Sequence, residues 1–283
     1  MKWQLLTEKQ RRRHKKNLRL TIAIVTVFMS VIAVSCAKNP DVLITEVGVT
    51  PPNKITPKTS KSGQFYIQGK IQHAKRNSQA AIAAYSKSIG LNPEYAPAYK
   101  SRGLVYFDIG KIEAAIADYN QALKLNPNDA ETLNNRGNAL ASVGNYLGAI
   151  ADYNQALSLA PKYAEAYNNR GNAKANQGDK NGAIEDYTEA IRIDENYAVA
   201  YNNRGNAYAA LGDPQKAIAD YNDAIRLNSN FGVAYNNRGN AYAVTGDKRG
   251  ALKDLQRAAA IFDKEGNKDL YQQAMKNIEE LGK

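Results

Sequence analysis

The chain is 283 residues long and carries a formal net charge of +11. Residues 1–62 hold twelve Lys/Arg against three Asp/Glu, a balance of +9, so the rest of the chain carries only +2. This small charge argues against a phosphate-binding surface and therefore against a nucleic-acid partner. The single cysteine, Cys36, excludes a disulfide within the chain.

The first predicted element is a membrane-targeting segment at residues 1–36. Eight Lys/Arg precede Leu20, and the uncharged, mostly apolar run LTIAIVTVFMSVIAVSCA follows up to Ala37. A spanning helix needs about 20 residues, so this run lies at the border between a signal-peptide core and a membrane span. The basic residues before it predict that the N-terminus stays in the cytoplasm and that the rest of the chain is translocated.

Cys36 follows Ala33, Val34 and Ser35, and this short motif resembles the lipobox of bacterial lipoproteins. The resemblance implies that Cys36 is lipidated and becomes the mature N-terminus. The chain would then be anchored by lipid in the bacterial cell membrane, with its remainder in the periplasm or extracytoplasmic space. An uncleaved signal anchor with an incidental cysteine is the alternative, and it has the same topology.

Residues 37–62 are predicted to form a flexible tether. They include KNPDVLITEVGVTPPNKITPKTSKS, which is rich in Pro, Lys and Thr and has no sustained apolar periodicity. Pro51, Pro52 and Pro57 favour extended backbone, which would hold the following domain away from the lipid surface.

A period of 34 residues organises most of the remaining chain. It is marked by glycines and alanines that each recur at this step: Gly69, Gly103, Gly137, Gly171, Gly205 and Gly239, and Ala81, Ala115, Ala149, Ala183, Ala217 and Ala251. This pattern resembles the tetratricopeptide repeat (TPR). The resemblance implies an all-α protein in which residues 63–265 form a right-handed superhelical solenoid of six helical hairpins with a concave groove. Residues 266–283 are predicted to form a capping helix, because their apolar side chains follow one side of a helix.

The residue spacing within one repeat predicts the same hairpin. Helical periodicity places Arg204 and Gly205 on the packed arc of one helix and Asp220 and Tyr221 on the packed arc of the next. The glycine lets the helices approach, and the tyrosine fills the gap between them. The segment LGDPQ at 211–215 separates them with a glycine to end the first helix, an aspartate to cap the second and a proline for its first turn.

Arginine and aspartate recur together on these packed arcs, and we expect them to form buried pairs. The predicted structural ion pairs are Arg102/Asp118, Arg136/Asp152, Arg170/Asp186, Arg204/Asp220 and Arg238/Asp254. The first repeat has Gln68 and Ala84 instead, so both partners are lost together. A pair that recurs in all five of the remaining repeats indicates a structural role, whereas catalysis needs a single convergent site.

The first repeat also departs from the pattern in other ways. Arg76 stands where the other repeats carry a turn glycine. Phe65, Tyr66, Ile67 and Phe107 are expected to pack at this end of the solenoid; an apolar mouth to the groove is the alternative.

No enzyme, metal site or cofactor is predicted. His14 lies in the leader, His73 stands alone, and the chain has no second cysteine and no Gly-rich phosphate loop.

Asparagines recur on the arc opposite the packed one, and we expect them to face water in the groove. They are Asn134, Asn135, Asn138, Asn168, Asn169, Asn172, Asn202, Asn203, Asn206, Asn236, Asn237 and Asn240. An asparagine amide offers a donor and an acceptor, so it can match the N–H and C=O of an extended peptide. Within the family, Asn135, Asn169, Asn203 and Asn237 match the asparagine ladder with which some superhelical members hold peptide backbones.

The function predicted from these features is a membrane-tethered extracytoplasmic adaptor that binds extended peptide segments of partner proteins in the groove. A passive structural or self-assembling scaffold, with solvated consensus asparagines, is the alternative. The carboxylate clamp of chaperone-binding members is a poorer match, because Glu131, Glu165, Val199 and Val233 occupy groove positions where the third clamp repeat carries a lysine. The partner's identity and the oligomeric state are left open.

Overall fold

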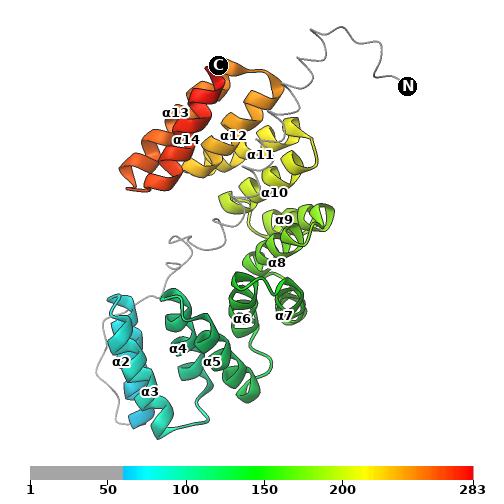
Figure 1. Cartoon of the computed structure of the whole chain (residues 1–283). Helices are drawn as coiled ribbons and strands as arrows, with labels where there is room; N and C mark the ends of the chain where they lie inside the picture. The colour runs from blue at the N-terminus through cyan, green and yellow to red at the C-terminus, as the bar shows by residue number, and fades with distance from the viewer. Residues whose placement is uncertain (1–59, 283) are drawn as a thin grey trace. The chain divides into compact units, whose positions relative to one another are not determined.

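The computed structural model describes residues 60–282 of the protein (Figure 1). The predicted targeting segment, Cys36 and nearly all of the predicted tether lie outside the described residues, and those predictions are not tested by the fold. Residues 60–282 form thirteen α-helices and contain no strand. None of these helices is both long enough and apolar enough to span a bilayer.

The described residues divide into two compact units, 60–177 and 178–282. The first unit contains α2 (Lys61–Ala74), α3 (Ser78–Leu91), α4 (Ala96–Asp108), α5 (Ile112–Leu125), α6 (Ala130–Ser142), α7 (Tyr146–Leu159) and α8 (Ala164–Asn176). The second unit contains α9 (Lys180–Ile193), α10 (Ala198–Ala210), α11 (Pro214–Leu227), α12 (Gly232–Thr245), α13 (Lys248–Lys264) and α14 (Lys268–Leu281).

Consecutive helices pack into hairpins, as the 34-residue period predicts. In the first unit α2 packs on α3, α4 on α5 and α6 on α7; in the second α10 packs on α11 and α12 on α13. Helices α8 and α9, which the period assigns to the fourth repeat, lie one in each unit. Each of the six predicted repeats therefore contains two helices, and in five of them the two helices form a hairpin within one unit.

The first helices of the hairpins form a layer of their own. In the first unit α4 contacts α2 and α6, and α6 contacts α8; in the second unit α12 contacts α10 and α14. The second helices of neighbouring hairpins lie farther apart. Each unit therefore has an inner layer of first helices and an outer layer of second helices, as expected of stacked repeats that each cannot bury an apolar face alone.

A glycine and a tyrosine set the distance between the two helices of a hairpin. A Cβ added at Gly137 would lie 2.6 Å from the ring of Tyr153, and one added at Gly205 would lie 2.6 Å from the ring of Tyr221. Tyr153 and Tyr221 are fully buried, together with the repeated alanine Ala217. The predicted role of the recurring glycine is therefore confirmed: a side chain there would displace the ring that fills the core.

The turn within each hairpin also follows the predicted chemistry. Gly212 has φ +82°, Asp213 caps α11 by accepting from the backbone N–H of Lys216, and Pro214 occupies the first turn. In the first repeat Arg76 takes the same left-handed conformation, with φ 57°. Arg76 is the one residue other than glycine within 60–282 that has a positive φ, so this departure of the first repeat from the pattern carries backbone strain.

Helix α14 covers the end of the last hairpin, as predicted for a capping helix. Ala274 is fully buried beside Phe262 of α13, and Leu270 packs against the same cluster. At the other end, Tyr66 packs against Tyr85 and Phe107 packs against the core around Tyr119, which agrees with the predicted packing role of these two aromatic residues.

One predicted boundary is wrong by two residues. Lys61 and Ser62, assigned to the tether, belong to the first turn of α2. Ser60 caps this helix by accepting from the backbone N–H of Gly63, and the Ser62 hydroxyl donates to the backbone oxygen of Ser88. A serine cap of this kind satisfies an otherwise unpaired N–H, so the helix begins earlier than its apolar pattern.

Candidate functional site

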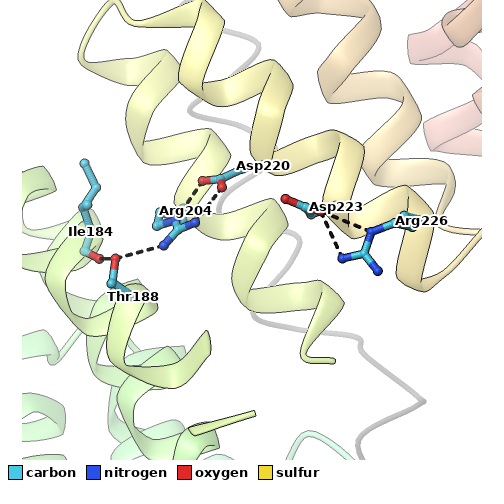
Figure 2. A network of polar contacts seen from close by, with 6 residues as sticks. All are labelled: Ile184, Thr188, Arg204, Asp220, Asp223 and Arg226. Atoms are coloured by element: carbon cyan, nitrogen blue, oxygen red, sulfur yellow. Dashed lines mark hydrogen bonds and ion pairs between the residues drawn. The ribbon is translucent and has the colours of Figure 1, made fainter. Parts of the chain in front are cut away.

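Four of the predicted ion pairs are present in the structure. The guanidinium of Arg204 donates to Asp220 from Nε at 2.9 Å and from Nη2 at 2.7 Å, which gives a two-pronged pair (Figure 2). The same geometry joins Arg102 to Asp118, Arg136 to Asp152 and Arg238 to Asp254. Arg170 and Asp186 belong to different units, and that pair stays a prediction.

The aspartates of the predicted pairs are buried, whereas the arginines are only partly buried. The buried aspartates are Asp118, Asp152, Asp186, Asp220 and Asp254. The side chains of Arg136 and Asp152 are 24% and 7% exposed, and those of Arg238 and Asp254 are 17% and 5% exposed. The expectation of a pair buried as a whole is therefore wrong for the arginine. Its long side chain keeps part of its surface in water while its guanidinium reaches the buried carboxylate.

Burial of the aspartates also decides what they can do. The carboxylate of Asp152 accepts from Arg136 at 2.8 and 2.6 Å, and that of Asp254 accepts from Arg238 at 2.6 and 2.9 Å. A buried carboxylate with both oxygens engaged is not accessible to a partner or a substrate. Asp152 and Asp254 are therefore structural residues and not binding residues.

The arginines also tie each hairpin to the preceding one. Nη1 of Arg204 donates to the hydroxyl of Thr188 on α9, and Figure 2 shows this bond beside the pair with Asp220. Equivalent bonds join Arg102 to Ser86, Arg136 to Asn120, Arg170 to Asn154 and Arg238 to Asn222. These acceptors were not predicted, although a small polar side chain recurs at their positions at the 34-residue step.

The guanidinium groups of these pairs are also held by their charge and by aromatic rings, as Arg102 illustrates. The hydrogen bonds that Arg102 donates to Asp118 raise the pKa of Arg102 above its ordinary value, although burial opposes the shift. The guanidinium also lies over the rings of Tyr99 and Tyr106. An arginine that is fully charged, paired and stacked has no free donor pair for a substrate, which supports a structural role.

The expectation that the asparagines face water is wrong for most of them. Eight of the twelve are buried, namely Asn134, Asn168, Asn202, Asn203, Asn206, Asn236, Asn237 and Asn240. The other four are half-buried, namely Asn135, Asn138, Asn169 and Asn172. The helical wheel predicted the correct arc, but that arc also contacts the neighbouring first helices, and it is this contact that removes the side chains from solvent.

Side-chain hydrogen bonds between asparagines connect successive first helices. In the first unit Nδ2 of Asn169 on α8 donates to Oδ1 of Asn134 on α6 at 3.0 Å. In the second unit Nδ2 of Asn237 on α12 donates to Oδ1 of Asn202 on α10 at 3.0 Å. We call this set of bonds the asparagine ladder. Buried amides need such partners, because an unpaired buried polar group is costly.

The core tyrosines enter the same ladder. The hydroxyl of Tyr221 donates to Oδ1 of Asn206 at 2.8 Å, and Asn237 donates to the same oxygen at 2.9 Å. In the first unit the hydroxyl of Tyr153 donates to Oδ1 of Asn138 at 2.6 Å. In the third and fifth repeats the third asparagine therefore accepts a hydrogen bond from the tyrosine hydroxyl of its own hairpin.

The ladder stops between α4 and α6. At the positions that correspond to Asn202 and Asn206, the second repeat carries Lys100 and Leu104. The hydroxyl of Tyr119, which corresponds to that of Tyr221, is buried without a hydrogen-bond partner. Nor does any hydrogen bond join the side chain of Asn135 to another residue within 60–282.

Carboxylates gather where the ladder stops. Nζ of Lys100 lies 3.1 Å from Asp129 and 2.6 Å from Glu131. Burial alone would lower the pKa of Lys100, but its hydrogen bonds to Glu131 and Asp129 and their charges raise it. Burial, together with the charges of Glu165, Glu131 and Asp129, raises the pKa of Tyr163 on the N-terminal side of α8. Lys100 is thus paired with two carboxylates, and Glu165 is a third carboxylate close to Tyr163.

No cluster of His, Cys, Asp and Glu suited to holding a metal ion occurs within residues 60–282. His73 contacts the carboxylate of Asp108 at 2.8 Å, and this is a single pair on the surface. The first helices within residues 60–282 therefore bring together a row of polar side chains, chiefly asparagines.

Family models match the chain over most of the repeat region. The model described as TPR repeat matches residues 103–144, 137–178 and 175–212, and two models described as Tetratricopeptide repeat match residues 65–95 and 198–231. Together these matches cover more than half of the chain. The chain belongs to the tetratricopeptide repeat family. These repeats make it a protein–protein interaction scaffold, a kind of module that is typically non-catalytic.

Solved structures share this fold. The crystal structure of MamA protein is 26% identical, covers 59% of this chain and 92% of that chain, and has a TM-score of 0.54. A tetratricopeptide repeat protein from Parabacteroides merdae is 23% identical over 76% of this chain and 84% of that chain, with a TM-score of 0.63. YrrB, described as a TPR protein with an unusual peptide-binding site, is 23% identical. The match covers 68% of this chain and 98% of that chain, with a TM-score of 0.51. A search of curated proteins finds no match.

Proposed function

We propose that the protein is a membrane-tethered extracytoplasmic adaptor that binds an extended segment of a partner protein along the first helices of its repeats. The observation that carries the proposal is a row of accessible polar side chains on adjacent first helices. Asn135 and Asn138 on α6 and Asn169 and Asn172 on α8 are half-buried, and α6 contacts α8 directly. A row of amides on neighbouring helices suits an extended backbone, which presents N–H and C=O groups along its length.

Small side chains on the same helices support this proposal. Ala141 on α6 and Ala175 on α8 are half-buried near the C-terminal ends of these helices. An alanine leaves room above the helix that a longer side chain would fill. YrrB, a chain of the same fold, is described as having a peptide-binding site, which is compatible with a similar use of the fold here.

The tether in this proposal rests on the sequence of residues 1–62. The basic leader, the apolar run and the motif that ends at Cys36 support export and lipid attachment. The Pro-rich residues after Cys36 support a spacer between the lipid and the repeats.

A passive scaffold is a second candidate, and the burial of the asparagines favours it. Asn202, Asn206 and Asn237 bond to one another and to Tyr221, so their presence is explained without a ligand. A scaffold of this kind would need the ladder for stiffness between repeats. The two candidates differ in whether the half-buried side chains on α6 and α8 contact a partner.

A peptide-display selection on the full chain separates the two candidates. Peptides selected for binding would be measured again against Ala175→Trp, which places an indole on the inner layer, and against Ala151→Trp. Ala151 is exposed on α7 in the outer layer and serves as the matched control. The adaptor predicts that Ala175→Trp abolishes binding, that Ala151→Trp leaves it intact, and that both variants melt as the parent does.

A selection that yields no binding peptide would reject the adaptor in favour of the passive scaffold. Peptides that bind Ala175→Trp as well as they bind the parent would reject the inner layer as the binding surface.

A further inference from the structure

The place where the asparagine ladder stops has a complete counterpart in the second unit. There, the hydroxyl of Tyr221 and the amide of Asn237 both donate to Oδ1 of Asn206, at 2.8 and 2.9 Å. Asn237 also donates to Asn202. Two donors from different helices therefore converge on acceptors that the preceding first helix supplies.

The first unit has the two donors and lacks the acceptors. Three repeats earlier, Tyr119 and Asn135 stand at the positions of Tyr221 and Asn237. Leu104 and Lys100 stand at the positions of Asn206 and Asn202, and neither side chain can accept a hydrogen bond. The missing group is therefore an oxygen that accepts.

Tyr119 and Asn135 lie close enough to share such an acceptor. Tyr119 packs against Ala139 of α6, and Ala139 is one helical turn from Asn135. One repeat earlier, the side chains at the corresponding positions, Tyr85 and Ser101, also lie close to each other. The Tyr119 side chain is fully buried and its hydroxyl is unpartnered, whereas Asn135 is half-exposed and open to a ligand.

The charges beside this position determine which segment would fit. Asp129 and Glu131 are paired with Lys100, at 3.1 and 2.6 Å, and the charges of both, with that of Glu165, raise the pKa of Tyr163. The cluster thus keeps two negative charges in excess, and Glu131 remains largely exposed while paired. A carboxylate ligand would be repelled here, and a neutral carbonyl next to a cation would be favoured.

We propose that, where the ladder stops between α4 and α6, Asn135 binds a main-chain carbonyl oxygen of an extended polypeptide, and that Glu131 and Glu165 select a segment with a lysine or arginine beside that carbonyl. The proposal rests on the adaptor function and names the class of its partner. The carbonyl gives Asn135 the acceptor that Asn206 gives Asn237 in the second unit, and the basic side chain offsets the surplus of carboxylates.

Binding of three model peptides to the full chain tests this proposal. The probes are acetylated and amidated peptides of equal length with alternating Ala-Lys, Ala-Gln or Ala-Glu sequence, followed by fluorescence anisotropy at low and moderate salt. We expect the Lys peptide to bind most tightly and the Glu peptide most weakly. The preference for the Lys peptide should shrink as salt rises, because partly exposed charges are screened.

Two variants separate the carbonyl contact from the charge contact. Asn135→Ala should weaken the binding of the Lys and Gln peptides by the same factor, about five-fold, since one neutral hydrogen bond is lost in each complex. The double variant Glu131→Gln with Glu165→Gln should weaken the binding of the Lys peptide alone, by about five-fold, since two ionic contacts that are at least partly exposed are lost. Asn181→Ala on α9 and Glu113→Gln on α5 change exposed residues of second helices and should have no effect.

A third variant supplies the missing acceptor from the protein itself. Leu104→Asn places an amide oxygen where Tyr119 and Asn135 can donate to it. In the second unit Oδ1 of Asn206 accepts from Tyr221 and Asn237 in the same way. This variant should lose affinity for the Lys and Gln peptides while it remains folded, which its melting curve would establish.

Unchanged affinity in Asn135→Ala would overturn the carbonyl site. Equal binding of the Lys and Gln peptides by the parent chain would overturn the selection for a basic segment. If displayed peptides bind and depend on Ala175 but the variants at Asn135, Glu131 and Glu165 have no effect, then this inference fails and the adaptor function stands. A chain that binds no peptide at all refutes both.

Discussion

Asn237 donates its side-chain amide to Oδ1 of Asn202, one hairpin earlier in the chain, at a distance of 3.0 Å. Both side chains are buried, and Asn237 also bonds to Asn206. Asparagine is a poor helix former, with a cost of about 0.6 kcal/mol relative to alanine. These bonds between hairpins are the compensation, because each amide satisfies a partner that would otherwise be buried and unpaired.

This relationship predicts opposite effects for two asparagines at the same repeat position. Asn237→Ala should lower the free energy of unfolding by about 1–3 kcal/mol, because it removes two buried hydrogen bonds and leaves Oδ1 of Asn202 without its donor. Asn135→Ala should leave that free energy unchanged or raise it by about 0.5 kcal/mol, because no hydrogen bond is lost and alanine favours the helix. Urea denaturation of both variants checks this prediction, and equal losses of stability would contradict it.

The sequence predicted the hairpins because their determinants are local and recur. Glycine and alanine recur at the positions of Gly205 and Ala217 in all six repeats, and tyrosine recurs at that of Tyr221 in the first five, so periodicity alone predicts that they lie in the core. The same is true of Asp213 and Pro214, whose turn chemistry acts over a few residues. The four observed ion pairs could be predicted because Gln68 and Ala84 replace both partners at once in the first repeat.

The environment of the asparagines could not be predicted from periodicity. A helical wheel shows which arc a side chain occupies, but it does not show how closely the next first helix approaches that arc. The bond from Asn169 to Asn134 spans 35 residues, and only the packing of α6 against α8 brings them together. The unpaired Tyr119 hydroxyl was missed for a related reason, because the replacement of an asparagine by Leu104 gains meaning only once Asn206 is seen to accept from Tyr221.

Lipidation at Cys36 is predicted from the leader, the apolar run and the motif before the cysteine. Protein extracted from membranes should have an intact mass that corresponds to a chain beginning at Cys36 with added acyl groups. Cys36→Ser should prevent both the cleavage and the added mass. An unmodified chain that still begins at Met1 would show that the segment is an uncleaved anchor.

Arg76 offers a simple route to a more stable first repeat. Its left-handed backbone, φ 57°, corresponds to that of Gly110, Gly144 and Gly212, where φ lies between +75° and +82°. Such a conformation costs a residue with a Cβ about 1 kcal/mol, whereas glycine adopts it freely. Arg76→Gly should therefore raise the free energy of unfolding by about 0.5–1 kcal/mol, which thermal and urea denaturation would detect. Gly110→Ala is the reciprocal control and should destabilise; a stabilised Gly110→Ala would contradict the strain argument.

The pair between Arg204 and Asp220 should behave as a unit in a double-mutant cycle. The side chains of Arg204 and Asp220 are only 18% and 7% exposed, so removing one partner leaves a charge with little water to replace the lost contact. Asp220→Ala alone should cost about 3 kcal/mol in the free energy of unfolding. Arg204→Gln combined with Asp220→Ala reproduces the residues of the first repeat, Gln68 and Ala84, and should cost less than the sum of the two single changes.

Urea denaturation of the four proteins in the cycle gives the coupling free energy directly. Arg226 and Asp223 form an exposed pair three residues apart on α11, and the same cycle there should give a coupling of only about 0.3 kcal/mol. The two pairs can be compared in Figure 2. A coupling for Arg204 and Asp220 as small as that of the exposed pair would mean that Thr188 and the ring of Tyr201, over which the guanidinium lies, hold it without help from the carboxylate. A coupling several times larger would establish the ion pair as the feature that joins the two helices of the hairpin.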